Sequence, residues 1–169
     1  SLFVVLGQVP PTVYAPRISP DGKRVAFETR DLSAGPDGPR LWTADLQDIA
    51  GRKVLPLVAG AINWAPMWTP DGQRLVFIVS GQSGDAVYWR RADGSGEAEH
   101  LIDTRAAEGW NAGGSQMRFL TLKESAANRD YGIAMLDMSS RKVTPIIDLP
   151  VGKGRRWMTR GVLSQAIGG

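Results

Sequence analysis

The sequence predicts an all-β protein built from about three repeated units, each a sheet of four short strands. One observation is an internal repeat, because residues 15–27 (APRISPDGKRVAF) and 65–77 (APMWTPDGQRLVF) share seven identical positions, and residues 110–119 form a fainter copy. A second observation is composition: 20 glycines and 11 prolines in 169 residues favour many short elements joined by turns.

The spacing of the repeat is the third observation. The turn glycines Gly22, Gly72 and Gly114 are 50 and 42 residues apart (72 − 22 and 114 − 72). Periods of this length are typical of solenoids, propellers and other repeat arrays.

Strand-forming residues alternate with turn residues along the whole chain. Residues 1–9 are rich in β-branched residues and predict a strand that ends at a double proline. The first unit is expected to have strands at 13–18, 24–29, 41–46 and 52–58. The second unit is expected at 62–68, 74–79, 86–91 and 99–102, and the third at 116–122, 131–138 and 141–147 after Trp110. Residues 74–79 are nearly all apolar, which predicts burial on both faces.

The turns between the first two strands have a physical explanation. In Pro-Asp-Gly, proline presets its own φ, the aspartate caps nearby backbone N–H groups, and the glycine accepts a positive φ. We therefore assign structural roles to the turn residues Asp21, Gly22, Asp71, Gly72 and Gly114.

Four strands per repeat with a Pro-Asp-Gly turn resemble the blades of a β-propeller. The motif SPDGKRVAF at residues 19–27 is similar to the WD40-like repeat of TolB-type propellers, and to the propeller domain of the prolyl-oligopeptidase family. We expect one partial propeller domain with blades at about 12–59, 60–104 and 105–149. Residues 1–9 and 154–169 would give strands to incomplete or shared blades.

Three blades are fewer than the four to eight of a closed propeller. Two chains could close a six-bladed ring with two-fold symmetry, or the chain could be part of a longer propeller. We favour the homodimer, because a separate stack would expose an apolar face and open strand edges.

Composition excludes several kinds of chemistry. The chain has no cysteine and one histidine, His100, which excludes disulfides, thiolate sites and paired-histidine metal motifs. It has no Gly-x-Ser-x-Gly elbow and no phosphate-binding glycine loop. We therefore expect no catalytic, cofactor-binding or metal-binding residues. The net charge of +3 is spread along the chain, so nothing favours nucleic-acid binding, and no apolar run is long enough to span a bilayer.

Candidate binding residues are few. Trp68 and Trp110 occupy equivalent repeat positions and are expected in the core, whereas Trp64 and Trp89 could line a channel or surface. The densest basic cluster lies near the end of the chain. The possible partner-binding residues are Trp64, Trp89, Lys153, Arg155, Arg156 and Trp157.

Three functions follow as hypotheses. The first is a non-catalytic propeller module that binds a protein or peptide partner; the TolB resemblance implies a bacterial origin and a periplasmic setting. The second is the gating propeller of a serine peptidase whose catalytic domain lies elsewhere. The third is a propeller that binds glycans or polyanions through tryptophan or arginine side chains.

Overall fold

The computed structural model describes residues 13–29, 40–54, 62–124 and 129–149. These residues form twelve strands in three antiparallel sheets, each with its four strands side by side in chain order, and they include no helix. The sheets are called blades 1, 2 and 3 below. This architecture confirms the predicted all-β fold of about three four-stranded blades.

The strands have the following bounds. Blade 1 contains β1 (Val13–Ile18), β2 (Arg24–Thr29), β3 (Arg40–Asp45) and β4 (Asp48–Val54). Blade 2 contains β5 (Ile62–Trp68), β6 (Arg74–Gly81), β7 (Gly84–Arg91) and β8 (Glu99–Ile102). Blade 3 contains β9 (Ala107–Trp110), β10 (Gln116–Glu124), β11 (Arg129–Asp137) and β12 (Val143–Leu149).

Two strands differ from the sequence-based expectation. The fourth strand of blade 1 begins at Asp48 rather than at residue 52, because a tight turn pairs Asp45 directly with Asp48. β9 was not predicted as a separate strand, since its sequence Ala-Glu-Gly-Trp contains no β-branched residue. The predicted strand at 1–9, and residues 55–58 of the strand predicted at 52–58, lie outside the described residues.

The Pro-Asp-Gly turns are built alike in the first two blades. Gly72 has φ of 67° and donates its N–H to the carbonyl of Thr69 at 2.8 Å. The Thr69 hydroxyl donates to Asp71 Oδ1 at 2.5 Å, and Asp71 also accepts the N–H of Gln73 at 2.9 Å. The hydrogen bond from the Thr69 hydroxyl lowers the pKa of Asp71 below its usual value. Ser19 and Asp21 make the same pair in blade 1, also at 2.5 Å, so the aspartates act as turn caps.

The third turn keeps this geometry with different residues. Gly114 has φ of 69° and donates to the carbonyl of Asn111 at 3.0 Å. The side-chain oxygen of Asn111 accepts the N–H of Gln116 at 3.0 Å, which is the bond that the Thr69 hydroxyl makes with Arg74 in blade 2. The asparagine side chain therefore replaces the serine or threonine hydroxyl as the cap. The third repeat forms the same turn as the other two, although its sequence resembles theirs only weakly.

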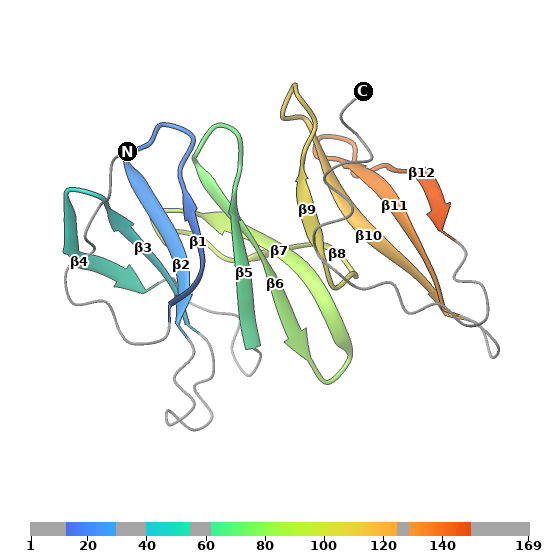
Figure 1. Ribbon diagram of the computed structural model, residues 1–169, viewed down its shortest axis with the longest axis horizontal. Coiled ribbons are helices and arrows are strands. Elements are labelled where there is room, and N and C mark those ends of the chain that lie inside the picture. Colours follow the sequence, from blue (N-terminus) through green and yellow to red (C-terminus); the bar gives the residue numbers. More distant parts are fainter. Residues whose placement is uncertain (1–12, 30–39, 55–61, 125–128, 150–169) are drawn as a thin grey trace.

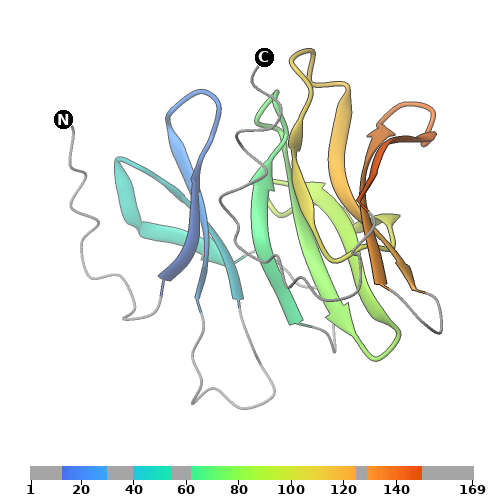
Figure 2. The same ribbon diagram turned by 45° about the vertical axis from the view of Figure 1, so that its right-hand side comes forward.

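The three blades stand side by side as a fan, with blade 2 in the middle (Figure 1). The main contacts between blades run from β5 to the first three strands of blade 1 and from β6 to β9. The blades therefore approach each other at their first strands, and the turned view shows the same order of the three sheets (Figure 2). The first strands β1, β5 and β9 define the inner edge of the fan.

β6 supplies apolar side chains to both neighbouring blades. Leu75 and Phe77 pack with Ala26 and Leu41 of blade 1 in one buried cluster. The alternate residues of β6 face the other way and pack with blade 3, in a cluster that includes Val76, Ile78, Met117, Phe119 and Leu136. Since successive side chains of a strand point to opposite faces, a strand between two sheets must be apolar throughout. This confirms the predicted burial of both faces.

Two tryptophans connect neighbouring blades by the same kind of hydrogen bond. The indole N–H of Trp68 donates to the backbone carbonyl of Arg17 in blade 1 at 2.8 Å. The indole N–H of Trp110 donates to the carbonyl of Trp68 in blade 2 at 2.9 Å. Trp68 is buried, as the repeat predicted, and Trp110 is half-buried against the core between blades 2 and 3. In blade 1 the equivalent residue is Ile18, which is 55% exposed and has no such donor.

Arg24 adds a second connection between blades 1 and 2. Its guanidinium donates to the carbonyl of Gly72 at 2.6 Å and lies 4.7 Å from the ring centre of Trp68. The turns themselves also meet, because a Cβ on Gly72 would lie 3.5 Å from Pro20, and one on Gly114 would lie 2.9 Å from Pro70. Each turn proline therefore packs against the turn glycine of the next blade.

This contact predicts different costs for two glycine substitutions. Gly22→Ala meets no atom within 4 Å but places alanine at φ of 72°, so it should lower the free energy of unfolding by about 1 kcal/mol. Gly114→Ala has the same backbone strain and also overlaps the Pro70 ring, so the loss should be clearly larger, about 2–4 kcal/mol. Urea unfolding of both variants measures the difference; equal losses would contradict the turn-to-turn packing.

A cleft at the inner edge of the blades as the candidate functional site

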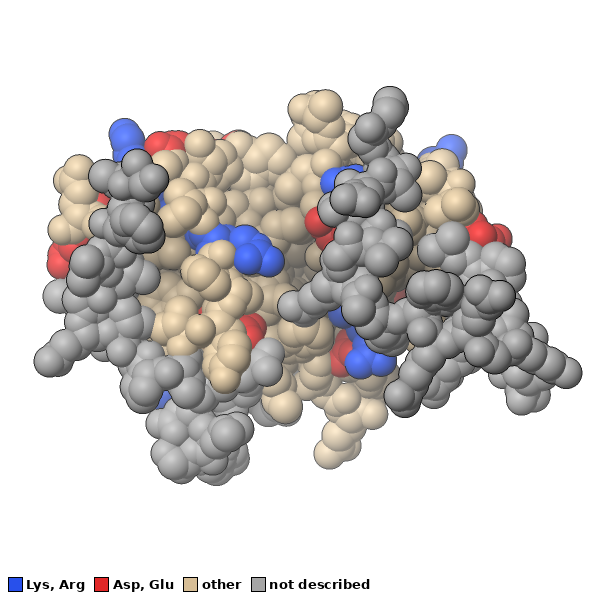
Figure 3. Space-filling model, viewed as in Figure 1, with Lys and Arg blue, Asp and Glu red and all other residues tan. Residues whose placement is uncertain are grey.

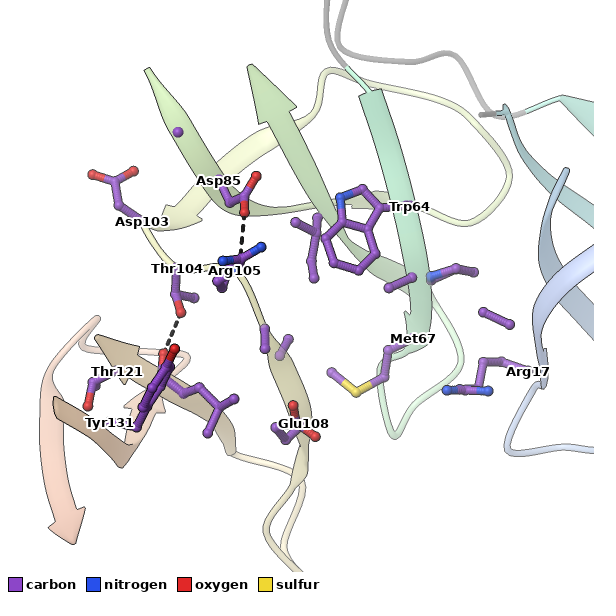
Figure 4. A pocket seen from close by; sticks show the side chains of 18 of the residues that line it. Arg17, Trp64, Met67, Asp85, Asp103, Thr104, Arg105, Glu108, Thr121 and Tyr131 are labelled. Atoms are coloured by element: carbon purple, nitrogen blue, oxygen red, sulfur yellow. Dashed lines mark hydrogen bonds and ion pairs between the residues drawn. The ribbon is translucent and has the colours of Figure 1, made fainter. Parts of the chain in front are cut away.

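A cleft of about 800 Å³ opens at the inner edge of the fan, mainly between blades 2 and 3. Its lining comes from β5, β9 and the loop between β8 and β9, with contributions from β1, β6, the turn into β7, β10 and β11. The volume is within the range of pockets that bind small molecules or peptide segments. Figure 4 shows the lining side chains from close by.

The floor and one wall of the cleft are apolar. Ile78 is buried at the floor, and Trp64, Met67 and Leu120 are half-buried along it. Tyr131 of β11 adds a half-buried aromatic side chain, and the remaining apolar lining consists of small residues, mostly alanines. An unbranched methionine beside an aromatic ring gives a surface that adapts to different apolar groups.

A backbone irregularity shapes this wall. The pairing of β5 with β6 shifts between Trp64 and Met67, and Ala65 between them has φ of 52°. Its N–H is bound by a carboxylate from the neighbouring blade, since Glu28 Oε2 accepts it at 2.7 Å and Glu28 is only 1% exposed. β1 has the same shift, with Ala15 at φ of 48°. Bulges of this kind re-aim the side chains on either side of them.

A chain of hydrogen bonds fixes the tryptophan. The indole N–H of Trp64 donates to Ser80 Oγ at 2.9 Å, and the Ser80 hydroxyl donates to Asp85 Oδ1 at 2.5 Å. Asp85 Oδ2 then lies 3.5 Å from Nε of Arg105, whose side chain is 63% exposed at the cleft. The polar edge of Trp64 is therefore occupied within the protein, and its apolar ring remains for a ligand.

A second polar contact lies on the same side of the cleft, at the loop between β8 and β9 (Figure 4). His100 Nε2 lies 2.7 Å from Asp103 Oδ1, and the His100 ring meets Tyr88 edge-on at 5.2 Å. The hydroxyl of Thr104 donates to the carbonyl of Leu120, which holds the β8–β9 loop against blade 3. Asp103 and Arg105 thus have side-chain partners on the protein itself.

Two charged side chains of the lining have no such partner. Arg17 of β1 donates only to the carbonyl of the adjacent Pro16, at 3.0 Å, and Glu108 of β9 makes no ion pair within the described part of the chain. Both are exposed. In Figure 4 they lie on opposite sides of Met67, each on the first strand of a different blade.

The two predicted tryptophan candidates lie in different environments. Trp64 lines the cleft, whereas Trp89 does not. The Trp89 ring lies between two guanidinium groups, with Arg74 at 4.2 Å and Arg141 at 5.0 Å from its centre. Its indole N–H donates to Glu99 at 2.9 Å. This hydrogen bond is the largest cause of the lowered pKa of Glu99, and the nearby positive charges of Arg74 and Arg141 lower it further. Trp89 therefore connects blade 2 with Arg141 of blade 3, and its ring is not an open surface for stacking a ligand.

The remaining predicted binding residues, Lys153, Arg155, Arg156 and Trp157, lie outside the described residues. Arg118 of β10 is half-buried, and its Nε is buried without a hydrogen-bond acceptor among the described residues. On the face drawn in Figure 3, acidic and basic side chains are scattered among uncharged ones and do not form one patch.

The described residues contain no group of three or more His, Asp or Glu side chains placed to hold a metal ion. His100 has an acid partner, but no serine hydroxyl of the described chain is hydrogen-bonded to it. No helix that could cross a membrane occurs in the described segments.

The sequence analysis missed most of the cleft. Arg17 and Met67 occupy the same position of the repeat, two residues after the bulged alanine. The repeat alone could therefore have indicated that both side chains lie along the inner edge of the blades. Asp85 lies at the start of β7 and Arg105 in the loop between β8 and β9, and no local pattern connects them.

Comparison with known proteins identifies the fold. No family model and no curated protein matches the chain. Solved structures do match. A TolB-type protein from Agrobacterium tumefaciens has 20% identity and a TM-score of 0.64, over 86% of this chain and 52% of that one. TolB from Acinetobacter baumannii has 19% identity and a TM-score of 0.59, over 79% and 31%.

Peptidases with propellers match similarly. The acylaminoacyl peptidase of Pyrococcus horikoshii has 14% identity and a TM-score of 0.61, over 83% of this chain and 25% of that one. The chain therefore spans about half of the Agrobacterium protein and less of the others. The three sheets are β-propeller blades. Their fold is that of the TolB-type propellers and of the propeller domains of prolyl-oligopeptidase relatives, as the repeat motif predicted.

Proposed function

We propose that this chain is a non-catalytic propeller module that binds a protein or peptide partner in the cleft at its inner edge. The observation that carries the proposal is the construction of the cleft. Its apolar floor is open, its tryptophan is held in place by Ser80, and charged side chains surround it. A site of this kind buries apolar side chains of a ligand and orients the ligand through a few polar contacts.

A peptide fits this site better than a catalytic substrate does. Among the described lining residues, Asp85 is engaged by Ser80 and Arg105, and Asp103 by His100, while the free carboxylate of Glu108 has no hydrogen-bonded nucleophile or second acid beside it. Chemistry at a bound substrate needs a free, positioned base or nucleophile. Binding needs only shape, apolar area and hydrogen-bonding groups.

The cleft predicts a specific effect of Trp64. Trp64→Leu should weaken peptide binding at least about tenfold, since it removes an aromatic anchor from a buried contact. The measurement is a selection of random peptides on the immobilised chain, followed by titration of the best binder. Trp89→Leu serves as the matched control, because the Trp89 ring is covered by two arginines and lies outside the cleft. Equal affinity of both variants would show that the cleft is not the peptide-binding site.

The second candidate function is the gating propeller of a serine peptidase. The likeness to the acylaminoacyl peptidase supports it, although that match covers only 25% of the peptidase chain. Further sequence of the gene distinguishes the two candidates, since a Gly-x-Ser-x-Gly elbow followed by an acid and a histidine would favour the peptidase.

We also propose that the fan is completed by further blades, supplied by a second copy or by more of the same polypeptide, and that the setting is periplasmic. The propeller fold supports completion by further blades, because blades normally close a ring. The periplasmic setting is what the resemblance to TolB-type propellers implies. A solution mass of about twice 18.3 kDa for this chain is expected from closure by two copies, and a stable monomer would contradict that form of closure.

A further inference from the structure

The charged side chains of the cleft differ in one respect that bears on its ligand. Arg105 and Asp103 already contact side chains of the protein, Asp85 and His100 respectively. Arg17 and Glu108 are exposed lining residues with no oppositely charged partner in the described segments. Among the described lining residues, they are the two charged side chains that no other side chain contacts, so they remain for a ligand.

Their placement gives the ligand a direction. Arg17 lies on β1 of blade 1, and Glu108 lies on β9 of blade 3. The strand between them, β5 of blade 2, carries the apolar side chains of Trp64 and Met67. Across the inner edge, the order is a positive charge, an apolar surface and a negative charge, as Figure 4 shows.

The dimensions suit an extended peptide. Sheets that pack face to face are about 10 Å apart, so two steps from blade 1 to blade 3 cover roughly 20 Å. An extended chain rises about 3.3 Å per residue, so about six residues cover this distance. Because the side chains of both partners shorten the gap, the charges of the ligand would be about four residues apart, with a large apolar residue midway.

We infer that the cleft selects a peptide segment of mixed charge: an acidic residue facing Arg17, a bulky apolar residue on Trp64 and Met67, and a basic residue facing Glu108. This inference rests on the proposed peptide-binding function and adds its specificity. A peptide with two like charges gains one favourable contact and meets one repulsive contact, so it is disfavoured against the mixed peptide.

The test uses fluorescein-labelled nonapeptides of glycine and serine with a central phenylalanine. Five peptides differ at the positions two residues before and two residues after the phenylalanine. In that order, the pairs are Glu and Lys, Lys and Glu, Glu and Glu, Lys and Lys, and Ser and Ser. Fluorescence anisotropy should show one mixed-charge peptide binding about tenfold tighter than the like-charged and neutral ones, at about threefold per exposed charge pair. The preference should shrink as salt rises, because both charges are exposed.

Charge-reversal variants make the inference specific to these two residues. Arg17→Glu should transfer the preference to the Lys and Lys peptide, and Glu108→Arg to the Glu and Glu peptide. Arg91→Glu and Glu97→Arg make the same changes in net charge at exposed positions outside the cleft and should leave the order unchanged.

The outcomes separate the two claims. If the peptides bind in a Trp64-dependent way but with the same order of affinity in the wild type and both cleft variants, the charge selection is wrong and the peptide-binding function stands. If none of the five peptides binds while randomly selected peptides do, the charge selection is likewise overturned. If no peptide binds in either experiment, both claims are overturned.

Discussion

The structure depends on one constraint: a central strand of the middle sheet is apolar on both faces, so this sheet needs a neighbour on each side. β6 shows this most clearly, since Leu75 and Phe77 pack against blade 1 while Val76 and Ile78 pack against blade 3. A single four-stranded sheet of this composition would expose both of these faces to water, at a cost of about 25 cal/mol for each Å² of apolar surface. Stacking of the sheets as blades follows from this pattern.

Apolar packing alone does not determine how the blades are oriented, and the polar contacts between them supply that information. The indole groups of Trp68 and Trp110 each reach a backbone carbonyl of the preceding blade, and Glu28 reaches the N–H of Ala65 in the following one. These contacts gather at the first strands, where the bulged backbone also opens the cleft. The groups that join the blades therefore shape the wall to which a ligand would bind.

The sequence predicted the fold well because the signals for it are local. A Pro-Asp-Gly turn between two strands is recognisable within ten residues, and residues 15–27 and 65–77 repeat it almost unchanged. The sequence predicted the third blade less well, because Asn111 replaces the hydroxyl cap and β9 contains no β-branched residue. Both are recognisable only once the turn geometry is known.

The cleft was much harder to predict. Its ion pair joins Asp85 with Arg105 across 20 residues (105 − 85), and its unpaired charges come from blades 1 and 3. Stacking of the blades brings these residues together, and no local sequence pattern predicts it. Trp64 was singled out as a candidate together with Trp89, and the arginines around Trp89 distinguish the two only in space.

The most direct test of this account is native-state hydrogen exchange of the backbone amides at the centres of β2, β6 and β10. If the blades stabilise each other as described, these amides exchange through the same global opening. The opening free energies of the three strands should then agree with one another and with the free energy of unfolding measured by urea. Exchange from β10 at a clearly lower free energy than from β6 would show that blade 3 opens independently, and would contradict the account.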